Sequence, residues 1–225
     1  DPGMRVLFLI PHPPEGASGR FRVLQYLPWL RQQGVQCEVR PFMSEQLYRV
    51  LYQPGKLPQK VALSAAALLR RCADLVRAAR ANVVVIHREA LPLGTALLER
   101  VIARLCPVVI FDFDDAIYLS NASGANRLFA WLKWPAKVGV ICGLSAHVTV
   151  GNEYLREFAR RHARESSVLP TTIDVERYQP RAPRRTPAIA DSRATRTTSA
   201  SRRAPTTSGR RGASPPARTA RWARP

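Results

Sequence analysis

The sequence predicts an α/β fold, in which a Rossmann-like, doubly wound parallel sheet is followed by a disordered basic tail. Continuous apolar runs rich in Val and Ile occur at residues 4–10, 82–87 and 107–112, as is typical of strands buried on both faces. Segments with apolar residues at helical spacing separate these runs. Regular alternation of strand and helix predicts a parallel sheet with helices on both faces.

In the N-terminal half, residues 4–10 are the first predicted strand, because prolines bound their apolar run. Residues 20–33 carry Phe and Leu at helical spacing, and Gly34 follows in the usual C-cap position. Residues 35–42 are the second predicted strand. The two elements after it are helices, a short one over 44–53 and a long one rich in Ala, Leu and Arg over 59–80.

The C-terminal half continues the alternation. Strands are predicted over 82–87, 107–112, 146–150 and 167–169. Helices are predicted over 91–105, 125–143 and 153–162. Pro135 interrupts the second of these helices, and Asn152 is placed to cap the third.

The positive charge is concentrated at one end of the chain. The formal net charge is +19, and residues 181–225 alone hold 12 Arg and 1 Asp. Arg, Ala, Thr, Ser and Pro make up 40 of these 45 residues, so the segment lacks the apolar surface that a folded core needs. We therefore expect a folded domain over 4–180 and a disordered tail over 181–225. The abrupt change of composition is also what a frameshift in a GC-rich gene produces.

Neither a membrane span nor a signal peptide is expected. The longest apolar run, residues 138–150, has 13 residues and contains His147, whereas a membrane-spanning helix needs about 18. Met4 and Arg5 lead directly into the first strand, without a small-residue cleavage site.

The cysteine pattern predicts a reducing compartment. Cys37, Cys72, Cys106 and Cys142 are widely spaced in apolar surroundings and form no C-x-x-C motif. Buried free thiols are the expected state, with a disulfide or a metal site as the alternative. The expected location is the cytoplasm, with peripheral contact to the inner face of the membrane left open.

Polar segments follow the predicted strands. Ligands of open parallel sheets bind beyond the carboxyl ends of the strands, which selects residues 11–20, 87–89, 112–115 and 151–152. Three of these four segments are polar or charged. The sequence therefore predicts a binding cleft at this edge of the sheet.

The loop after the first strand is a candidate anion site. Backbone N–H groups at a helix N-terminus favour anions, and Gly16 and Gly19 let the backbone approach a phosphate closely. Ser18 and Arg20 belong to the same loop, although Ser18 could instead only cap the helix. The dinucleotide fingerprint and the P-loop motif are both absent, and no cofactor is expected.

Three carboxylates crowd the end of the fourth strand and are the candidate catalytic residues. Strand geometry places Asp112 and Asp114 on one face and Asp115 on the other. Their mutual repulsion calls for a cation, a basic partner or sugar hydroxyls. A magnesium or manganese site and simple turn capping are the alternatives, and no metal is assigned.

The segment after the third strand has two interpretations. Arg88 is suited to bind a phosphate or carboxylate with two parallel hydrogen bonds. Arg88 and Glu89 are equally suited to structural ion pairs. His87 precedes them, and of the other histidines only His12 lies near the predicted cleft.

Aromatic residues and lysines alternate further along the chain, at Phe129, Trp131, Lys133, Trp134 and Lys137. Such a stretch suits the headgroup region of a membrane. The alternative is an amphipathic helix that packs its aromatic residues inward.

Residues 4–180 resemble the N-terminal, acceptor-side domain of a GT-B glycosyltransferase of family 4. The segments that carry the resemblance are residues 4–11, 16–22, 87–90, 111–116, 151–155 and 168–174. The last two are the most specific, a strand followed by Gly-Asn and a helix, and then the sequence Leu-Pro-Thr-Thr-Ile-Asp. Where family members often have a histidine near the fourth strand end, this chain has aspartates.

The resemblance implies a retaining transfer of a sugar from a nucleotide-sugar to a glycan or lipid-linked acceptor, in polysaccharide biosynthesis. The loop from Gly16 to Arg20 would lie against the donor diphosphate or the acceptor. The turn of Asp112 to Asp115, the turn of His87 to Glu89, and Asn152 would line the acceptor side. The family stabilises the departing nucleotide diphosphate while the acceptor hydroxyl attacks from the same face.

The resemblance ends near Pro180. In the family a second lobe follows, which holds the nucleotide and an E-x-x-x-x-x-x-x-E pair, whereas here the basic segment begins. The comparison implies a truncated enzyme, and we expect the chain alone to show little or no transfer. Another chain or another reading frame would supply the second lobe.

Two other functions are open at this point. The arginine-rich tail could bind nucleic acid or an anionic surface, without base specificity and with strong salt dependence. The second alternative function is that of a nicotinamide- or flavin-dependent enzyme. It is disfavoured by the missing glycine fingerprint and by Arg40-Pro41-Phe42, which stand where an acidic residue is expected.

Overall fold

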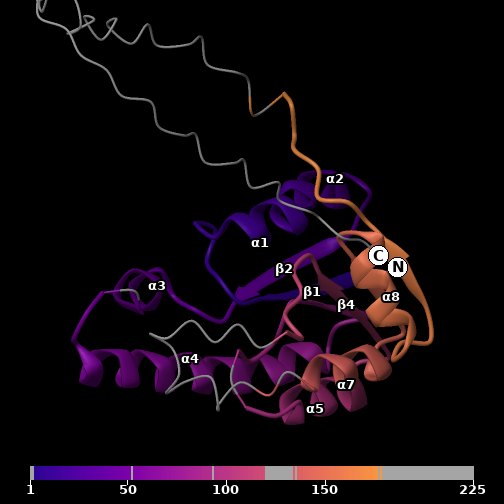
Figure 1. Ribbon diagram of the computed structural model, residues 1–225. Helices are drawn as coiled ribbons and strands as arrows, with labels where there is room; N and C mark the ends of the chain where they lie inside the picture. Colours follow the sequence, from indigo (N-terminus) through magenta and orange to yellow (C-terminus); the bar gives the residue numbers. More distant parts are fainter. Residues whose placement is uncertain are drawn as a thin grey trace, which may run out of the picture. The chain divides into compact units, whose positions relative to one another are not determined.

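Figure 1 shows the computed structural model, which describes residues 3–51, 53–92, 94–119, 134, 136–176 and 178. Residues 1–179 form one compact unit. The predicted disordered tail, residues 181–225, lies outside the described residues. So does most of the predicted helix over 125–143.

Six parallel strands form one sheet in the order β2-β1-β3-β4-β5-β6, which confirms the predicted α/β fold. The strands are β1 (Arg5–Ile10), β2 (Gln36–Pro41), β3 (Val83–His87), β4 (Val108–Phe113), β5 (His147–Val150) and β6 (Ser166–Val168). All six correspond to the predicted strands within one residue at each end. They form because β-branched and aromatic side chains pack well on a pleated, buried surface.

Helices cover both faces of the sheet (Figure 1). One face carries α1 (Ala17–Arg22), the short helix η1 (Leu24–Tyr26) and α2 (Leu27–Gln32). The other carries α4 (Leu57–Ala78), α5 (Leu97–Leu105), α7 (Lys137–Leu144) and α8 (Glu153–Arg160). A further helix, α3 (Glu45–Leu51), joins β2 to α4.

Alternation along β1 divides the core into two layers. Val6, Phe8 and Ile10 pack with Val23 and Leu27 under the first set of helices. The intervening residues of β1 join the larger cluster on the opposite face, which includes the aromatic residues of β4 and the buried residues of α5, α7 and α8. A strand buried on both faces is what the continuous apolar run predicts.

Two predicted helices differ from the structure by more than two residues at an end. The predicted helix over 20–33 is interrupted at Val23, and Pro28 lies in the first turn of α2, where the missing N–H costs no hydrogen bond. The helix expected from residue 91 begins at Leu97, after Gly94 with φ +77°. Only the end of the predicted helix over 125–143 is described, and it forms α7, which begins at Lys137.

Two capping predictions are confirmed. Gly34, which follows α2 and lies two residues before β2, has φ +79°, a left-handed conformation that favours glycine. The side chain of Asn152 accepts a hydrogen bond from the N–H of Leu155 at 3.0 Å, which caps α8.

All four cysteines are free. Cys106 and Cys142 are buried, Cys37 is half-buried, and Cys72 is exposed on α4, so the prediction of buried thiols is wrong for Cys72. Of the helices in the described part of the chain, none combines the length and the hydrophobicity needed to cross a bilayer.

Candidate functional site

The candidate site lies at the carboxyl ends of β1, β3 and β4. From β1 the chain crosses to β2 on one side, and from β2 it returns to β3 on the other side of β1. The crossovers therefore diverge between β1 and β3, where the carboxyl ends of the strands leave a place for a ligand.

Strand register brings three polar side chains into one row. His87 is paired with Asp112 across β3 and β4, and Asp112 is paired with Thr149 across β4 and β5. The Nδ1 atom of His87 lies 2.7 Å from Asp112 Oδ2. The hydroxyl of Thr149 donates to Asp112 Oδ1 at 2.6 Å. Asp112 thus accepts hydrogen bonds from both neighbouring strands.

Helix α1 adds two residues to this row from above the sheet. Ser18 and Arg22 are four positions apart, so they share one helix face. The Arg22 guanidinium forms a buried ion pair with Asp112, in which Nε donates to Oδ2 at 3.1 Å and Nη2 donates to Oδ1. It also donates to the backbone oxygen of Leu169, beyond β6.

These contacts fix the charge of Asp112. Burial alone raises the pKa of this carboxyl, but hydrogen bonds and positive charge from His87 and Arg22 outweigh burial and hold its pKa below the ordinary value. Asp112 is therefore an anion that holds His87 and Arg22 in place.

Ser18 links this row to Asp114. Its hydroxyl oxygen lies 2.8 Å from His87 Nε2 and 2.8 Å from Asp114 Oδ2. The hydroxyl has one hydrogen, so it donates to one neighbour and accepts from the other. When the Ser18 hydroxyl gives its hydrogen to Asp114 Oδ2 and takes a proton from His87 Nε2, one proton passes from His87 to Asp114, and the reverse steps return it. The arrangement can therefore relay a proton along Asp114, Ser18 and His87.

One atom of this cluster lacks a partner among the described residues. Asp114 Oδ1 is buried from solvent and accepts no hydrogen bond there. A buried carboxylate oxygen without a donor is costly, and a hydroxyl of a bound ligand would remove that cost. Gly151 permits the close packing beside it, because a Cβ at Gly151 would meet the Cα of Asp114 at 3.2 Å.

Arg88 and Glu89, which were also predicted to line the acceptor side, form ion pairs. Arg88 Nη2 lies 2.9 Å from Asp115 Oδ2, and Glu89 Oε1 lies 3.2 Å from Lys137 Nζ. Asp115 thus separates from the other two carboxylates, as strand alternation predicts. Arg88 has φ +64°, a left-handed conformation that is strained for a residue with a side chain.

In the predicted anion loop, the glycines serve close packing. Gly16 is the N-cap of α1, and a Cβ there would lie 2.7 Å from the Cβ of His12. Gly19 packs on Ile10 of β1. The Ser18 side chain does not cap α1, whose N-cap has no side-chain hydrogen bond, so the capping alternative does not hold.

Arg20 belongs to α1, and His12 belongs to the loop before that helix. The Arg20 guanidinium carbon lies 5.6 Å from the ring centre of Phe21, and its buried Nε has no hydrogen-bond partner among the described residues. The pKa of His12 is lowered by burial and then by the positive charges of Arg88 and His87. The pKa direction supports the prediction that His12 lies near the cleft.

Two other predictions concern Asn152 and the stretch of aromatic residues and lysines over 129–137. Asn152 is exposed and caps α8. Lys137 is 1% exposed and pairs with Glu89, which removes it from any membrane-facing surface. Phe129, Trp131 and Lys133 lie outside the described residues.

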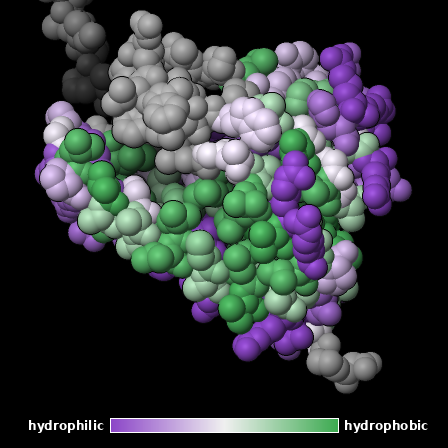
Figure 2. Space-filling view, turned by 90° about the horizontal axis from the view of Figure 1, so that it is seen from below, coloured by the Kyte–Doolittle hydropathy of each residue, from purple (hydrophilic) through white to green (hydrophobic). Residues whose placement is uncertain are grey.

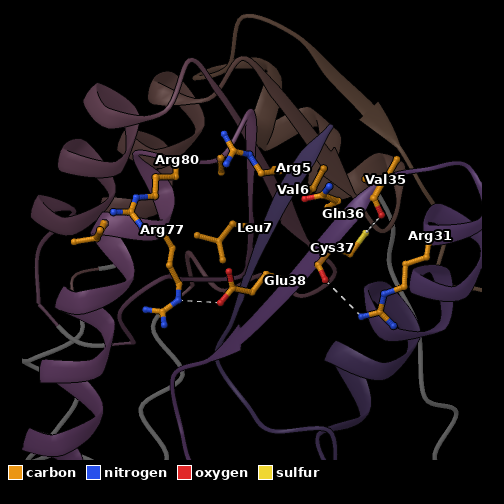
Figure 3. A pocket seen from close by; sticks show the side chains of 12 residues that line it. Arg5, Val6, Leu7, Arg31, Val35, Gln36, Cys37, Glu38, Arg77 and Arg80 are labelled. Atoms are coloured by element: carbon orange, nitrogen blue, oxygen red, sulfur yellow. Dashed lines mark hydrogen bonds and ion pairs between the residues drawn. The ribbon is translucent and has the colours of Figure 1, made fainter. Parts of the chain in front are cut away.

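A separate groove lies at the opposite end of the sheet. It has a volume of about 880 Å³ and is formed by the amino ends of β1 and β2 and the carboxyl end of α4. Figure 3 shows Arg5, Arg77 and Arg80 around it, with Arg77 bonded to Glu38 at 2.9 Å. We assign the candidate site to the other edge, because buried, hydrogen-bonded titratable groups converge there.

Sequence reasoning missed Arg22 and Thr149 and did not predict that Ser18, His87 and Asp112 align. Thr149 could have been found in the same way as His87, since each is a polar residue near the carboxyl end of a buried strand. Arg22 is marked by its four-residue spacing from Ser18.

In the part of the chain that the structure describes, no three His, Cys, Asp or Glu side chains are grouped to hold a metal ion. No protein-family model matches the chain, and no curated protein matches it.

Proposed function

We propose that residues 4–180 are the acceptor-side lobe of a retaining GT-B glycosyltransferase, and that the cluster of Ser18, His87, Asp112 and Asp114 binds a sugar hydroxyl of the acceptor. The observation that carries this proposal is the buried Oδ1 of Asp114, which has no hydrogen-bond donor among the described residues. A sugar hydroxyl is a donor of the kind that this oxygen lacks.

The surrounding contacts support a positioning role. Asp114 Oδ2 is held by Ser18, and Ser18 is held by His87, which Asp112 fixes from its other ring nitrogen. A carboxylate held in this way is preorganised to orient a hydroxyl that reaches it. A proton that Asp114 takes from the bound hydroxyl can also pass to His87 Nε2, if Ser18 accepts it and gives its own hydrogen to that nitrogen.

Titration of the isotopically labelled chain with a panel of methyl glycosides tests the proposal. We expect amide signals near Ser18 and Asp114 to shift with at least one glycoside. Asp114→Asn should weaken that binding about tenfold or more, since a hydrogen bond to a charged group contributes about 1.5–3 kcal/mol. The matched control is Asp115→Asn, which alters a carboxylate whose side chain is 63% exposed. Equal binding by the two variants, or no response to any glycoside, contradicts the proposal.

A second candidate function is acyl transfer through Ser18. It is favoured by the chain of contacts from Ser18 to His87 to Asp112, which has the order of a Ser-His-Asp triad. Asp114 opposes it by competing for the Ser18 hydroxyl, and His87 is fully buried. A fluorophosphonate probe distinguishes the two: covalent labelling at Ser18 would favour acyl transfer, whereas an unlabelled chain favours the saccharide site.

A further inference from the structure

Helix α4 departs from the usual pattern of a surface helix, although its Leu63 and Leu75 pack against the core. The side facing the molecule buries Ala67, Arg71, Asp74 and Ala78, at intervals of four, three and four residues. Arg71 and Asp74 are an ion pair there, and burial lowers the pKa of Arg71 to about 10. A helix of this kind normally turns its charged residues to water and its leucines to the core.

The outward side of α4 is apolar along its whole length. Its large exposed side chains are Leu57 (62%), Val61 (60%), Leu68 (42%), Leu69 (72%) and Val76 (56%). Exposed Cys72 continues the same stripe. With 22 residues, the helix is about 33 Å long. Helix α5, which packs beside α4, also has large exposed apolar side chains, Leu97 and Leu105.

We call this surface, made of those residues of α4 and α5, the α4 face. Figure 2, which views the molecule from below Figure 1, shows hydrophobic residues gathered on the side where α4 and α5 lie. Contiguous apolar surface of this extent marks a contact with another molecule or with a membrane.

Charge selects the kind of partner. The acidic residues of the two helices, Asp74 and Glu99, are 3% and 1% exposed. The basic residues on or beside the helices are half-buried or exposed, except for Arg71: they are Lys56, Lys60, Arg70, Arg77, Arg80, Arg100 and Arg104. The α4 face is thus apolar with a basic rim, and neither α4 nor α5 has an exposed acidic side chain.

A second copy of the chain fits this surface poorly. Antiparallel pairing of two α4 helices would bring Lys56 and Lys60 of one copy toward Arg77 and Arg80 of the other. Parallel pairing would bring Arg70 toward Arg70. Both arrangements place like charges together at an apolar contact, which is unfavourable.

We propose that the α4 face is a docking surface for an anionic lipid bilayer. Leu69, Val76 and their neighbours enter the boundary between headgroups and acyl chains, while the basic rim contacts anionic headgroups. The lysine and arginine side chains reach the headgroups from the edges of the helix. The inference stands apart from the proposed function, since it uses none of the residues of the candidate site.

Cys72 offers a direct test, because it lies within the stripe and is the one exposed cysteine of the four. The full chain, with Cys37→Ser, is labelled at Cys72 with an environment-sensitive nitrobenzoxadiazole fluorophore. Vesicles of equal parts phosphatidylcholine and phosphatidylglycerol should shift its emission to the blue and raise its intensity. Pure phosphatidylcholine vesicles should have little effect. The probe separates insertion of α4 from simple adsorption through the basic residues 181–225.

Variants complete the test. Leu69→Glu with Val76→Glu should lower vesicle affinity about tenfold or more, since two apolar side chains lose their burial. Trp29→Glu is the matched control, because Trp29 is 60% exposed on α2 and should bind as the unaltered chain does. An unchanged urea midpoint shows that the double variant remains folded.

Three results would overturn the proposal. The first is vesicle binding without a change in the Cys72 probe, which would place the contact elsewhere in the chain. The second is a probe shift that depends on protein concentration and needs no lipid, which would indicate a second copy. The third is equal vesicle affinity of the double variant and the Trp29→Glu control.

Discussion

At the scale of single residues, Asp112 holds the candidate site together. It accepts hydrogen bonds from His87, Arg22 and Thr149, and its side chain is 7% exposed. Asp112→Asn leaves the Arg22 guanidinium, which is 1% exposed, without a compensating charge. We expect a loss of about 3–5 kcal/mol in the free energy of unfolding by urea. Asp115→Asn, at the exposed ion pair, should cost less than about 1 kcal/mol.

The pH dependence of stability follows from the same residue. The pKa of Asp112 is lower in the folded chain than in the unfolded chain. Its stabilisation is therefore fully present above the ordinary carboxyl pKa of about 4 and is lost as pH falls through the folded value. Urea unfolding of the unaltered chain and of Asp112→Asn, compared from neutral pH downward, should show the difference between them shrinking. A difference independent of pH would contradict this.

Arg88 gives a second prediction at this scale, because its φ of +64° is strained. Glycine adopts this conformation without a Cβ penalty, whereas alanine does not. Both substitutions remove the pair with Asp115, so comparing them isolates the backbone. Arg88→Gly should be more stable than Arg88→Ala by about 1 kcal/mol in urea unfolding. The reverse order would show that the turn carries no strain.

At the scale of elements, the cap of α8 can be tested alone. Asn152→Ala removes the acceptor for the Leu155 N–H and should cost about 1 kcal/mol of unfolding free energy. Asn152→Ser retains an acceptor and should cost much less. If the two variants are equally stable, the hydrogen bond is not the source of the effect.

The strands were predictable because buried β-branched runs have few alternatives. The break at Val23 was not, because Phe21, Leu24, Leu27 and Leu30 fit one helical period and the sequence does not say where the backbone bends. Proline at position 28 was the available signal.

The candidate site was predictable only in part. The rule on strand ends found Ser18, His87, Asp112 and Asp114. Their contacts join residues 69, 96 and 25 positions apart, and they depend on the relative register of neighbouring strands. Hydrophobic periodicity fixes which face a side chain occupies but leaves the register between distant strands open. The hydrogen bonds between these side chains could therefore not be predicted from the sequence.

At the scale of the whole molecule, the candidate site and the α4 face occupy separate surfaces. The site lies between the sheet and α1, whereas the α4 face lies outside the helices that cover the opposite face of the sheet. Effects of distant substitutions add when they share no partner. Leu69→Glu with Val76→Glu should thus leave glycoside binding unchanged, and Asp114→Asn should leave vesicle affinity unchanged. Coupling beyond about twofold in either assay would contradict this separation.

The central claim is that a ligand hydroxyl completes the hydrogen bonding of Asp114, and a crystal structure of the chain soaked with the best-binding methyl glycoside tests it most directly. The account predicts a sugar hydroxyl within hydrogen-bond distance of Asp114 Oδ1, with Ser18, His87 and Asp112 in the arrangement described. A glycoside bound elsewhere, such as in the groove lined by Arg5, Arg77 and Arg80, would contradict it. So would an Asp114 Oδ1 atom already bonded to the protein itself.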